Sequence, residues 1–241
     1  ARYRREQMNK VTSYLDASFV YGNDAKRAMA LRTGCGGELA SQTHPSSRRA
    51  MPPFNIPTRA VDNEETEEVG KVGVVRGHRG QTAMENANPL AAPTEAMFVL
   101  GDTRAMENPG LLGLQVIFLR EHNYLAAKIR AALQRETGLE DRSPPEVCNT
   151  SHDEEVYQLT RVLLIAMWQS LVYHEFLPIL LGGANQAAAA VWRDGSYTGY
   201  DASIDASVFN EFATAAHRFG HSISPSSYMV NPERGSSGAD D

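Results

Sequence analysis

The sequence has little cysteine, no long apolar run and no excess of positive charge. Its two cysteines, Cys35 and Cys148, lie far apart, so neither belongs to a zinc or redox motif, which needs closely spaced ligands. The most hydrophobic stretch, Val162 to Trp168, is much shorter than the roughly 20 apolar residues that cross a bilayer, so we predict no membrane span. Lys and Arg number 23 against 29 Asp and Glu, without a basic stripe, so we predict no nucleic-acid partner.

What the chain does have is enough apolar material for a sizeable core. Its 241 residues, 42% of them hydrophobic, could form one large domain or two small ones. The triplet Asn149-Thr150-Ser151 is an N-glycosylation sequon in a polar stretch that should be exposed. Spacing alone leaves open whether Cys35 pairs with Cys148. No apolar signal region follows the charged N-terminus, so we expect processing or truncation to have removed preceding residues.

The first part of the chain shows no strong helical pattern. Residues 8 to 21 alternate loosely and include β-branched and aromatic side chains, ending at the turn residues Gly22-Asn23. Residues 32 to 93 have no periodicity, are rich in Gly, Pro, Ser and Asn, and include an acidic run from Asp62 to Glu68. We interpret residues 32 to 93 as a long surface excursion, which in a compact domain usually indicates function, a partner or disorder.

Helices are predicted from residue 108 onward. Asn108 is a favoured N-cap and Pro109 suits the first helical position, so a helix of about six turns should begin there. Its apolar positions are Leu111, Leu114, Phe118, Leu125, Ile129 and Leu133. A second helix is expected over residues 153 to 181, apolar on nearly all sides, until Pro178 ends or kinks it and Gly182-Gly183 stops it. Its predicted buried face is Val156, Leu159, Leu163, Met167 and Leu171.

A third helix, over residues 207 to 222, carries two patterned faces. The apolar stripe is Val208, Phe212, Ala215 and Phe219, and the polar face is Asn210, Thr214, His217 and His221. His221 could be a haem or metal ligand, but it could equally be an ordinary surface or core histidine. His217 lies four residues earlier and could share a metal with it, although no accompanying Glu motif is present.

Two further groups of residues could carry chemistry. Arg104 and Glu107 directly precede the capped helix, and a permanently charged guanidinium could stabilise negative charge that develops on a bound molecule. The alternative is a surface ion pair near a helix N-terminus. Oxygen-bearing residues also recur at every second position in Thr12, Tyr14, Asp16 and Ser18. In an extended loop they would suit calcium, which takes six to eight oxygen ligands, whereas in a strand they would form its polar face.

Taken together, four blocks in this order resemble the signature blocks of the animal haem peroxidase family, within the peroxidase-cyclooxygenase superfamily. They are Val11 to Gly22, Gly101-Asp102-Thr103-Arg104 through Glu107, Phe118 to Asn123, and Asn210 through His221. Leu177-Pro178 with Leu181-Gly182 fits the same pattern between the last two blocks. The sequence is most similar to the peroxidasin and peroxinectin types. The resemblance implies a mainly α, helical haem peroxidase fold with long irregular loops and few short strands, and residues 1–241 would be an internal part of that domain.

The resemblance also implies roles for individual residues. His221 would be the proximal ligand of haem iron and Arg104 the distal catalytic arginine. Glu107 matches a glutamate that can form an ester with a haem methyl group, and Arg218 would lie near the haem. A calcium loop is implied for Thr12, Tyr14 through its carbonyl, Asp16 and Ser18. His122 would be structural, and His217 stands where the family has an aromatic residue, so neither would be a ligand. The implied cofactors are haem b, with or without a covalent link, and calcium.

The sequence departs from the family pattern in three places. It does not contain the Leu-Asp-His-Asp block, upstream of the calcium loop, that carries the distal histidine, the second haem ester and a calcium aspartate. It also lacks the downstream asparagine that orients the proximal imidazole, and cysteines that often precede Gly-Asp-x-Arg are replaced by Ala96-Met97-Phe98. We therefore expect the parent protein, rather than the isolated chain, to be active.

The function implied is reduction of hydrogen peroxide with oxidation of a halide or phenolic donor, in a secreted protein. Domains outside this chain could contact extracellular-matrix or adhesion partners. One alternative is a haem-less interaction module of the same fold, for which haem content in the parent protein is the discriminating measurement. A second is a fatty-acid dioxygenase of the same superfamily, against which Gly101 to Arg104 with Glu107 speaks, because that block belongs to the peroxidase branch.

Overall fold

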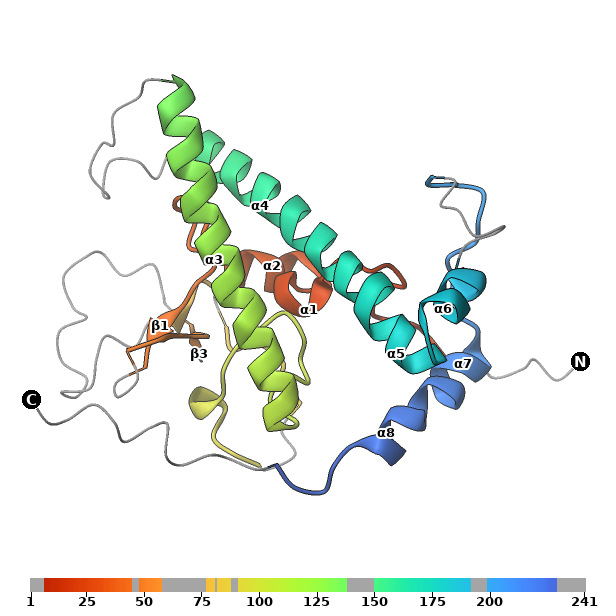
Figure 1. Ribbon diagram of the computed structural model, residues 1–241. Coiled ribbons are helices and arrows are strands. Elements are labelled where there is room, and N and C mark those ends of the chain that lie inside the picture. Colours follow the sequence, from red (N-terminus) through yellow and green to blue (C-terminus); the bar gives the residue numbers. More distant parts are fainter. Residues whose placement is uncertain are drawn as a thin grey trace, which may run out of the picture. The chain divides into compact units, whose positions relative to one another are not determined.

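The computed structural model describes residues 7–44, 48–57, 77–80, 82–87, 91–137, 150–191 and 199–228. Cys148, Asn149 of the sequon and the acidic run at 62–68 lie outside the described residues. The chain forms two compact units: unit 1 comprises Ala1–Asn9 and Asp205–Asp241, and unit 2 comprises Lys10–Ile204. Unit 2 is dominated by helices, which confirms the mainly α fold predicted from the sequence (Figure 1).

The longest helix of unit 2 is α3, Pro109–Thr137. It begins where the sequence predicts, because the Asn108 side-chain oxygen accepts a hydrogen bond of 2.8 Å from the backbone N–H of Leu111. At 29 residues it runs for about eight turns rather than six. Its buried residues include Val116, Phe118, Leu119, His122 and Ala126, whereas the predicted apolar positions Leu111 and Leu114 are exposed.

Helix α4, Thr150–Leu171, packs against α3 (Figure 1). Its buried side is Val156, Tyr157, Thr160 and Leu164, and the Thr160 hydroxyl donates to the carbonyl of Val156 at 2.7 Å. The prediction that Leu159, Leu163, Met167 and Leu171 are buried is wrong, because all four are exposed. The helix is apolar on several sides, and among the described residues only one of these sides meets the core.

A wide turn continues this helix toward Pro178. The π-helical segment η2, Val172–Phe176, closes with a hydrogen bond from the N–H of Leu177 to the carbonyl of Val172, and α5, Leu177–Leu181, follows directly. Pro178 therefore does not end the helix. Gly182, in the left-handed conformation at φ 84°, ends it as predicted, and α6, Ala184–Val191, begins after Gly183.

One stretch of the described residues, His152–Leu181, is long and apolar enough by length and composition to cross a membrane. The sequence analysis did not find it because polar residues interrupt every apolar run in it. The same properties occur in helices that pack against other protein, and α4 already buries one side on α3. The prediction of no membrane span stays a prediction.

The N-terminal part of unit 2 is short helices joined by turns. The last residues of the loosely alternating segment form α1, Ser18–Tyr21, and α2 covers Ala25–Leu31. Asp24 caps α2 by accepting a hydrogen bond of 2.8 Å from the N–H of Arg27. The 3-10 turn η1 covers Thr94–Ala96.

In their described parts, residues 32 to 93 have more regular structure than the surface excursion that the sequence predicts. Strand β1, Gln42–Thr43, pairs antiparallel with β2, Ala50–Met51, and β3, Phe54–Pro57, pairs parallel with β4, Gly77–His78. Asn55 and His78 are fully buried, and a 3.1 Å hydrogen bond joins the Asn55 Oδ1 to the His78 Nε2. This buried side-chain hydrogen bond stabilises an irregular backbone, which sequence periodicity cannot predict.

The main core of unit 2 gathers α1, α2, α3 and α4 around aromatic side chains. Phe19 meets Phe118 and Trp168 edge-on, with ring centroids 5.2 and 4.9 Å apart. Cys35, in the loop after α2, is disulfide-bonded. Two residues later Gly37, at φ +72°, donates its N–H to Asp153 Oδ1 at 2.7 Å and accepts at its carbonyl from His122 Nε2 at 2.8 Å.

Unit 1 contains the predicted third helix, but in three pieces. They are α7, Asn210–Thr214, the 3-10 turn η4, Ala216–Phe219, and α8, Gly220–Ile223. The helix breaks at Ala215, whose φ and ψ of −131° and −64° are not helical. Val208, Phe212 and Phe219 of the predicted apolar stripe are exposed, so packing does not hold the segment in one regular helix.

Replacing Gly37 with alanine should destabilise the chain by about 3 kcal/mol. A Cβ there would lie 2.5 Å from Val156 Cγ1 and 2.7 Å from the Tyr157 nitrogen, on a backbone that favours glycine. Gly113→Ala is the matched control, because no atom lies within 4 Å of its Cβ and alanine favours a helix by up to about 1 kcal/mol. Urea unfolding measures both, and equal midpoints for the two variants would contradict the role of Gly37.

Candidate active site

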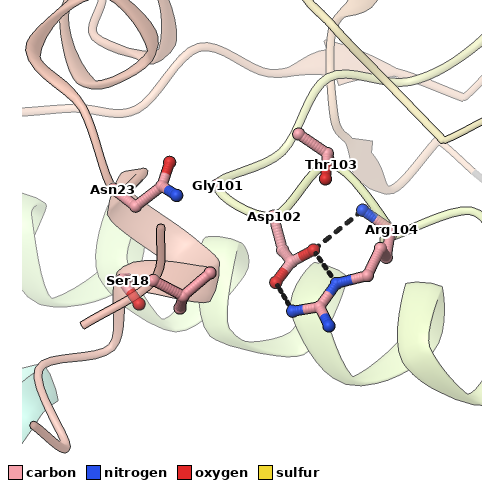
Figure 2. A pocket seen from close by; sticks show the side chains of 7 residues that line it. Ser18, Asn23, Gly101, Asp102, Thr103 and Arg104 are labelled. Atoms are coloured by element: carbon pink, nitrogen blue, oxygen red, sulfur yellow. Dashed lines mark hydrogen bonds and ion pairs between the residues drawn. The ribbon is translucent and has the colours of Figure 1, made fainter. Parts of the chain in front are cut away.

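Arg104 is held in place by a carboxylate two residues before it. Asp102 Oδ1 accepts from the Arg104 backbone N–H at 2.8 Å and from its Nε at 2.9 Å, and Oδ2 accepts from Nη2 at 2.7 Å (Figure 2). The pair is side-on and bidentate, the geometry in which a guanidinium is most firmly oriented. Among the described residues no acceptor meets Nη1, so this edge of the guanidinium is available to a ligand.

The charges of this pair stabilise one another. Burial alone would raise the pKa of Asp102, but the hydrogen bonds from the Arg104 side chain and backbone outweigh it and hold that pKa below its ordinary value. The hydrogen bond that Arg104 donates to Asp102 in turn raises the pKa of Arg104 against the effect of burial. Because 54% of the Arg104 side chain is exposed, solvent screening keeps the energy of this pair small.

Arg104 and Asp102 lie at a small pocket shared with the N-terminal segment. Its lining residues are Val11, Ser18, Asn23, Gly101, Asp102, Thr103 and Arg104 (Figure 2). Gly101 allows the close approach, since a Cβ there would lie 2.5 Å from the carbonyl oxygens of Ser18 and Phe19. The space of about 40 Å³ admits a molecule the size of one or two waters. The fold thus joins two of the blocks that the sequence analysis treated separately.

Thr12, Tyr14, Asp16 and Ser18 lie in a loop that leads into α1, not in a strand. Thr12 Oγ1 accepts from the N–H of Tyr14 at 3.1 Å, and Asp16 Oδ1 accepts from the N–H of Ser18 at 3.0 Å. These bonds leave Asp16 Oδ2 and the Tyr14 carbonyl for a cation. Within the described residues no group of three or more His, Cys, Asp or Glu side chains gathers as a metal site. Hydroxyl, carbonyl and carboxylate oxygens suit calcium chemically, but this loop supplies at most four of the ligands that calcium needs.

His221 lies in α8 of unit 1 and is exposed. No described residue hydrogen-bonds to its imidazole, so either ring nitrogen, in the tautomer that leaves it unprotonated, can bind a metal. His217 differs, because its Nδ1 lies 3.2 Å from the carbonyl of Phe212 and must donate to it. The break at Ala215 also removes the common helical face that the sequence predicts for Asn210, Thr214, His217 and His221.

Glu107 and Arg218 are the remaining predicted site residues. Glu107 is exposed, and its backbone N–H donates to the carbonyl of Arg104 at 2.9 Å, which keeps it one turn from the pocket arginine. Arg218 belongs to η4, three residues before His221. Arg104 and Glu107 thus belong to unit 2, and Arg218 and His221 to unit 1.

Asp102 is the residue that the sequence analysis missed as a partner of Arg104. An aspartate two residues before an arginine can accept its backbone N–H in a turn, and this spacing could have suggested it.

A protein-family model described as "Animal haem peroxidase" matches residues 2–239 of the chain. The chain belongs to the animal haem peroxidase family. It is 34% identical over 217 residues to Peroxinectin A from Dictyostelium discoideum, covering 90% of this chain and 31% of that protein. It is 35% identical over 221 residues to thyroid peroxidase from Sus scrofa, covering 90% of this chain and 19% of that protein.

A solved structure supports the same family at the level of fold. Peroxidase A from Dictyostelium discoideum superposes with a TM-score of 0.57 at 31% identity, over 86% of this chain and 31% of that one. The chain therefore spans about a third or less of the length of these relatives. Membership of a haem peroxidase family implies haem binding.

The described residues fit a haem in their chemistry. An exposed imidazole without a hydrogen-bond partner can serve as an axial ligand, and an exposed carboxylate one turn from Arg104 can meet a porphyrin edge. The pocket at Arg104 is too small for a porphyrin, so it suits a small ligand and not the cofactor itself.

Asp102→Asn should lower the free energy of unfolding at pH 7 by up to about 1 kcal/mol. The pKa of Asp102 is depressed in the folded chain, so its contribution is complete above the unfolded value near 3.9 and is lost as pH falls through the lower folded value. The difference between wild type and variant should therefore shrink toward pH 2. Urea unfolding at pH 7, 4 and 2.5 measures it. Glu107→Gln removes the same charge without a side-chain hydrogen bond, and an equal loss in that control would contradict the assignment.

Proposed function

We propose that this chain is the part of a haem peroxidase that supplies the distal arginine, the proximal histidine and part of a calcium loop. The observation that carries the proposal is the Arg104 guanidinium, which Asp102 fixes at a small pocket and whose Nη1 meets no acceptor among the described residues. Family membership supports a peroxidase-type reaction. Haem, when bound, supplies reduction of hydrogen peroxide and oxidation of a halide or phenolic donor.

Arg104 acts as a hydrogen-bond donor to the peroxide. Its Nη1 would offer a permanently charged N–H to an oxygen that becomes more negative as the O–O bond breaks, while Asp102 holds the other edge of the guanidinium. The Gly101 to Arg104 block with Glu107 resembles the peroxidase branch of the superfamily, which supports the peroxidase over a dioxygenase. We assign peroxide proton transfer to no residue of this chain.

His221 would hold the haem iron, and Arg218, three residues before it, would offer a positive charge to the anionic edge of the cofactor. Glu107 offers its carboxylate for an ester to a haem methyl group. Thr12, Tyr14, Asp16 and Ser18 give calcium up to four oxygens, and the remaining ligands come from outside this loop. A bound calcium would fix the loop that leads to Ser18 at the Arg104 pocket.

The setting proposed is a secreted protein. The disulfide at Cys35 supports an oxidising compartment, because such bonds persist mainly outside the cytosol. Hydrogen peroxide and a small electron donor would be its substrates, and domains outside this chain would supply matrix or adhesion contacts.

His221→Ala in the full-length parent should abolish the native Soret band, because the iron loses its axial ligand. Haem content by pyridine haemochrome and the Soret spectrum measure this. His217→Ala is the matched control, since its imidazole is already bonded to the Phe212 carbonyl and should leave the spectrum unchanged. A normal Soret band in the His221 variant would remove the proximal assignment, and a wild-type parent without haem would favour the interaction module.

Arg104→Gln should slow the reaction of the haem-loaded parent with hydrogen peroxide by about 10²–10³-fold, because a charged donor to the developing oxyanion is lost. Stopped-flow absorbance of the Soret band gives the rate constant. Arg135→Gln removes an equal charge from the exposed last turn of α3 and should leave the rate unchanged. A rate within about two-fold of wild type for the Arg104 variant would show that the guanidinium plays no part in this step.

A further inference from the structure

A buried tyrosine and a buried histidine form a hydrogen-bonded pair that the proposed peroxidase chemistry does not use. Tyr21 of α1 is 2% exposed and His122 of α3 is 0% exposed. The Tyr21 hydroxyl lies 2.9 Å from His122 Nδ1, and His122 Nε2 lies 2.8 Å from the carbonyl oxygen of Gly37. Both nitrogens of the imidazole are therefore engaged.

The Gly37 carbonyl fixes the direction of the hydrogen bond. A carbonyl oxygen can only accept, so Nε2 must carry the proton. In a neutral imidazole Nδ1 is then the acceptor, and the Tyr21 hydroxyl must donate to it. The phenolic proton of Tyr21 thus points at a base within hydrogen-bond distance.

The surroundings keep this pair neutral until an electron is removed. Burial raises the pKa of Tyr21 well above its ordinary value, and burial lowers the pKa of His122 to about 4. The Arg161 guanidinium lies 5.5 Å from the centroid of the Tyr21 ring and disfavours positive charge on it. Oxidation of the phenol must therefore be accompanied by loss of its proton, for which His122 is the adjacent acceptor.

We propose that Tyr21 is a redox-active tyrosine. A one-electron oxidant removes an electron from the phenol while the hydroxyl proton moves to His122 Nδ1. The products are a neutral tyrosyl radical and an imidazolium that keeps its Nε2–H on Gly37. A one-electron donor restores the phenol, and the proton returns from His122. In the parent protein the oxidant is the peroxide-oxidised haem, so this part of the inference rests on the proposed function.

The position of Tyr21 suits such a relay. Ser18, one turn earlier in α1, lines the pocket that contains Arg104. On the other side the Tyr21 ring meets Tyr157 edge-on at 5.9 Å, and the Arg32 guanidinium lies 3.9 Å above the Tyr157 ring. An oxidising equivalent produced near the small pocket could thus move to a protected site in the core, where the radical is shielded from reaction with other molecules.

The test is electron paramagnetic resonance of the haem-loaded full-length parent after oxidation. One arm uses photogenerated tris(bipyridine)ruthenium(III), and a second uses hydrogen peroxide. In the ruthenium arm we expect a persistent tyrosyl radical that Tyr21→Phe abolishes and Tyr157→Phe retains. His122→Gln keeps a hydrogen-bond acceptor for the phenol but no base, so the radical yield should fall by about ten-fold or more.

Each outcome decides the inference. A persistent signal of equal size in wild type and Tyr21→Phe would overturn it, as would a full yield in His122→Gln. Circular dichroism shows whether Tyr21→Phe folds. If it does not, two other measurements decide: the radical yield of His122→Gln, and the loss of hyperfine structure when the protein contains ring-deuterated tyrosine. A Tyr21 signal with ruthenium but none with peroxide upholds the redox-active pair and contradicts its coupling to the haem. Failure of the peroxidase proposal is thereby separate from failure of this one.

Discussion

Two hydrogen bonds at Gly37 hold together segments that are distant in the sequence. Its N–H reaches Asp153 of α4, its carbonyl receives His122 of α3, and His122 in turn accepts from Tyr21 of α1. A side chain at this position would collide with Val156, so the three helices can meet only around a glycine. Because α1 also contributes Ser18 to the Arg104 pocket, the geometry of that pocket depends on a junction deep in the core.

The helices of unit 2 could be predicted where local chemistry determines them. Asn108 and Pro109 fix the start of α3, and Gly182 fixes the end of α5, because capping needs only neighbouring residues. Burial was harder to predict. Leu159 and Leu163 recur with helical spacing as clearly as Val156 and Leu164, and periodicity cannot say which apolar side faces the core of this chain. The prediction of one continuous third helix was wrong for a related reason. Phe212 and Phe219 are exposed, so packing of these side chains does not keep Ala215 in a helical conformation.

The candidate site was predicted as separate blocks, and its roles remain predictions. The sequence identifies Arg104 through the resemblance of Gly101 to Arg104 to a family block, because a guanidinium before a capped helix could equally form a surface ion pair. It could not show that Asp102 orients Arg104 or that Ser18 lies across the same pocket, because both follow from how Gly101 packs against α1. The Tyr21–His122 pair lies 101 residues apart in the sequence, and only the fold brings it together.

The wide turn at Val172–Phe176 has a consequence for the surface of the long helical rod. A π turn contains one residue more than an α turn, so the side chains after it are rotated by about 100° relative to those before it. On a regular α-helix Met167 and Ile179, which are 12 residues apart in sequence, would differ in direction by about 120°, and the extra residue reduces this to about 20°. The wide turn therefore brings exposed apolar residues of α4 and α5 toward the same side of the rod. A single partner surface laid along the rod could contact both.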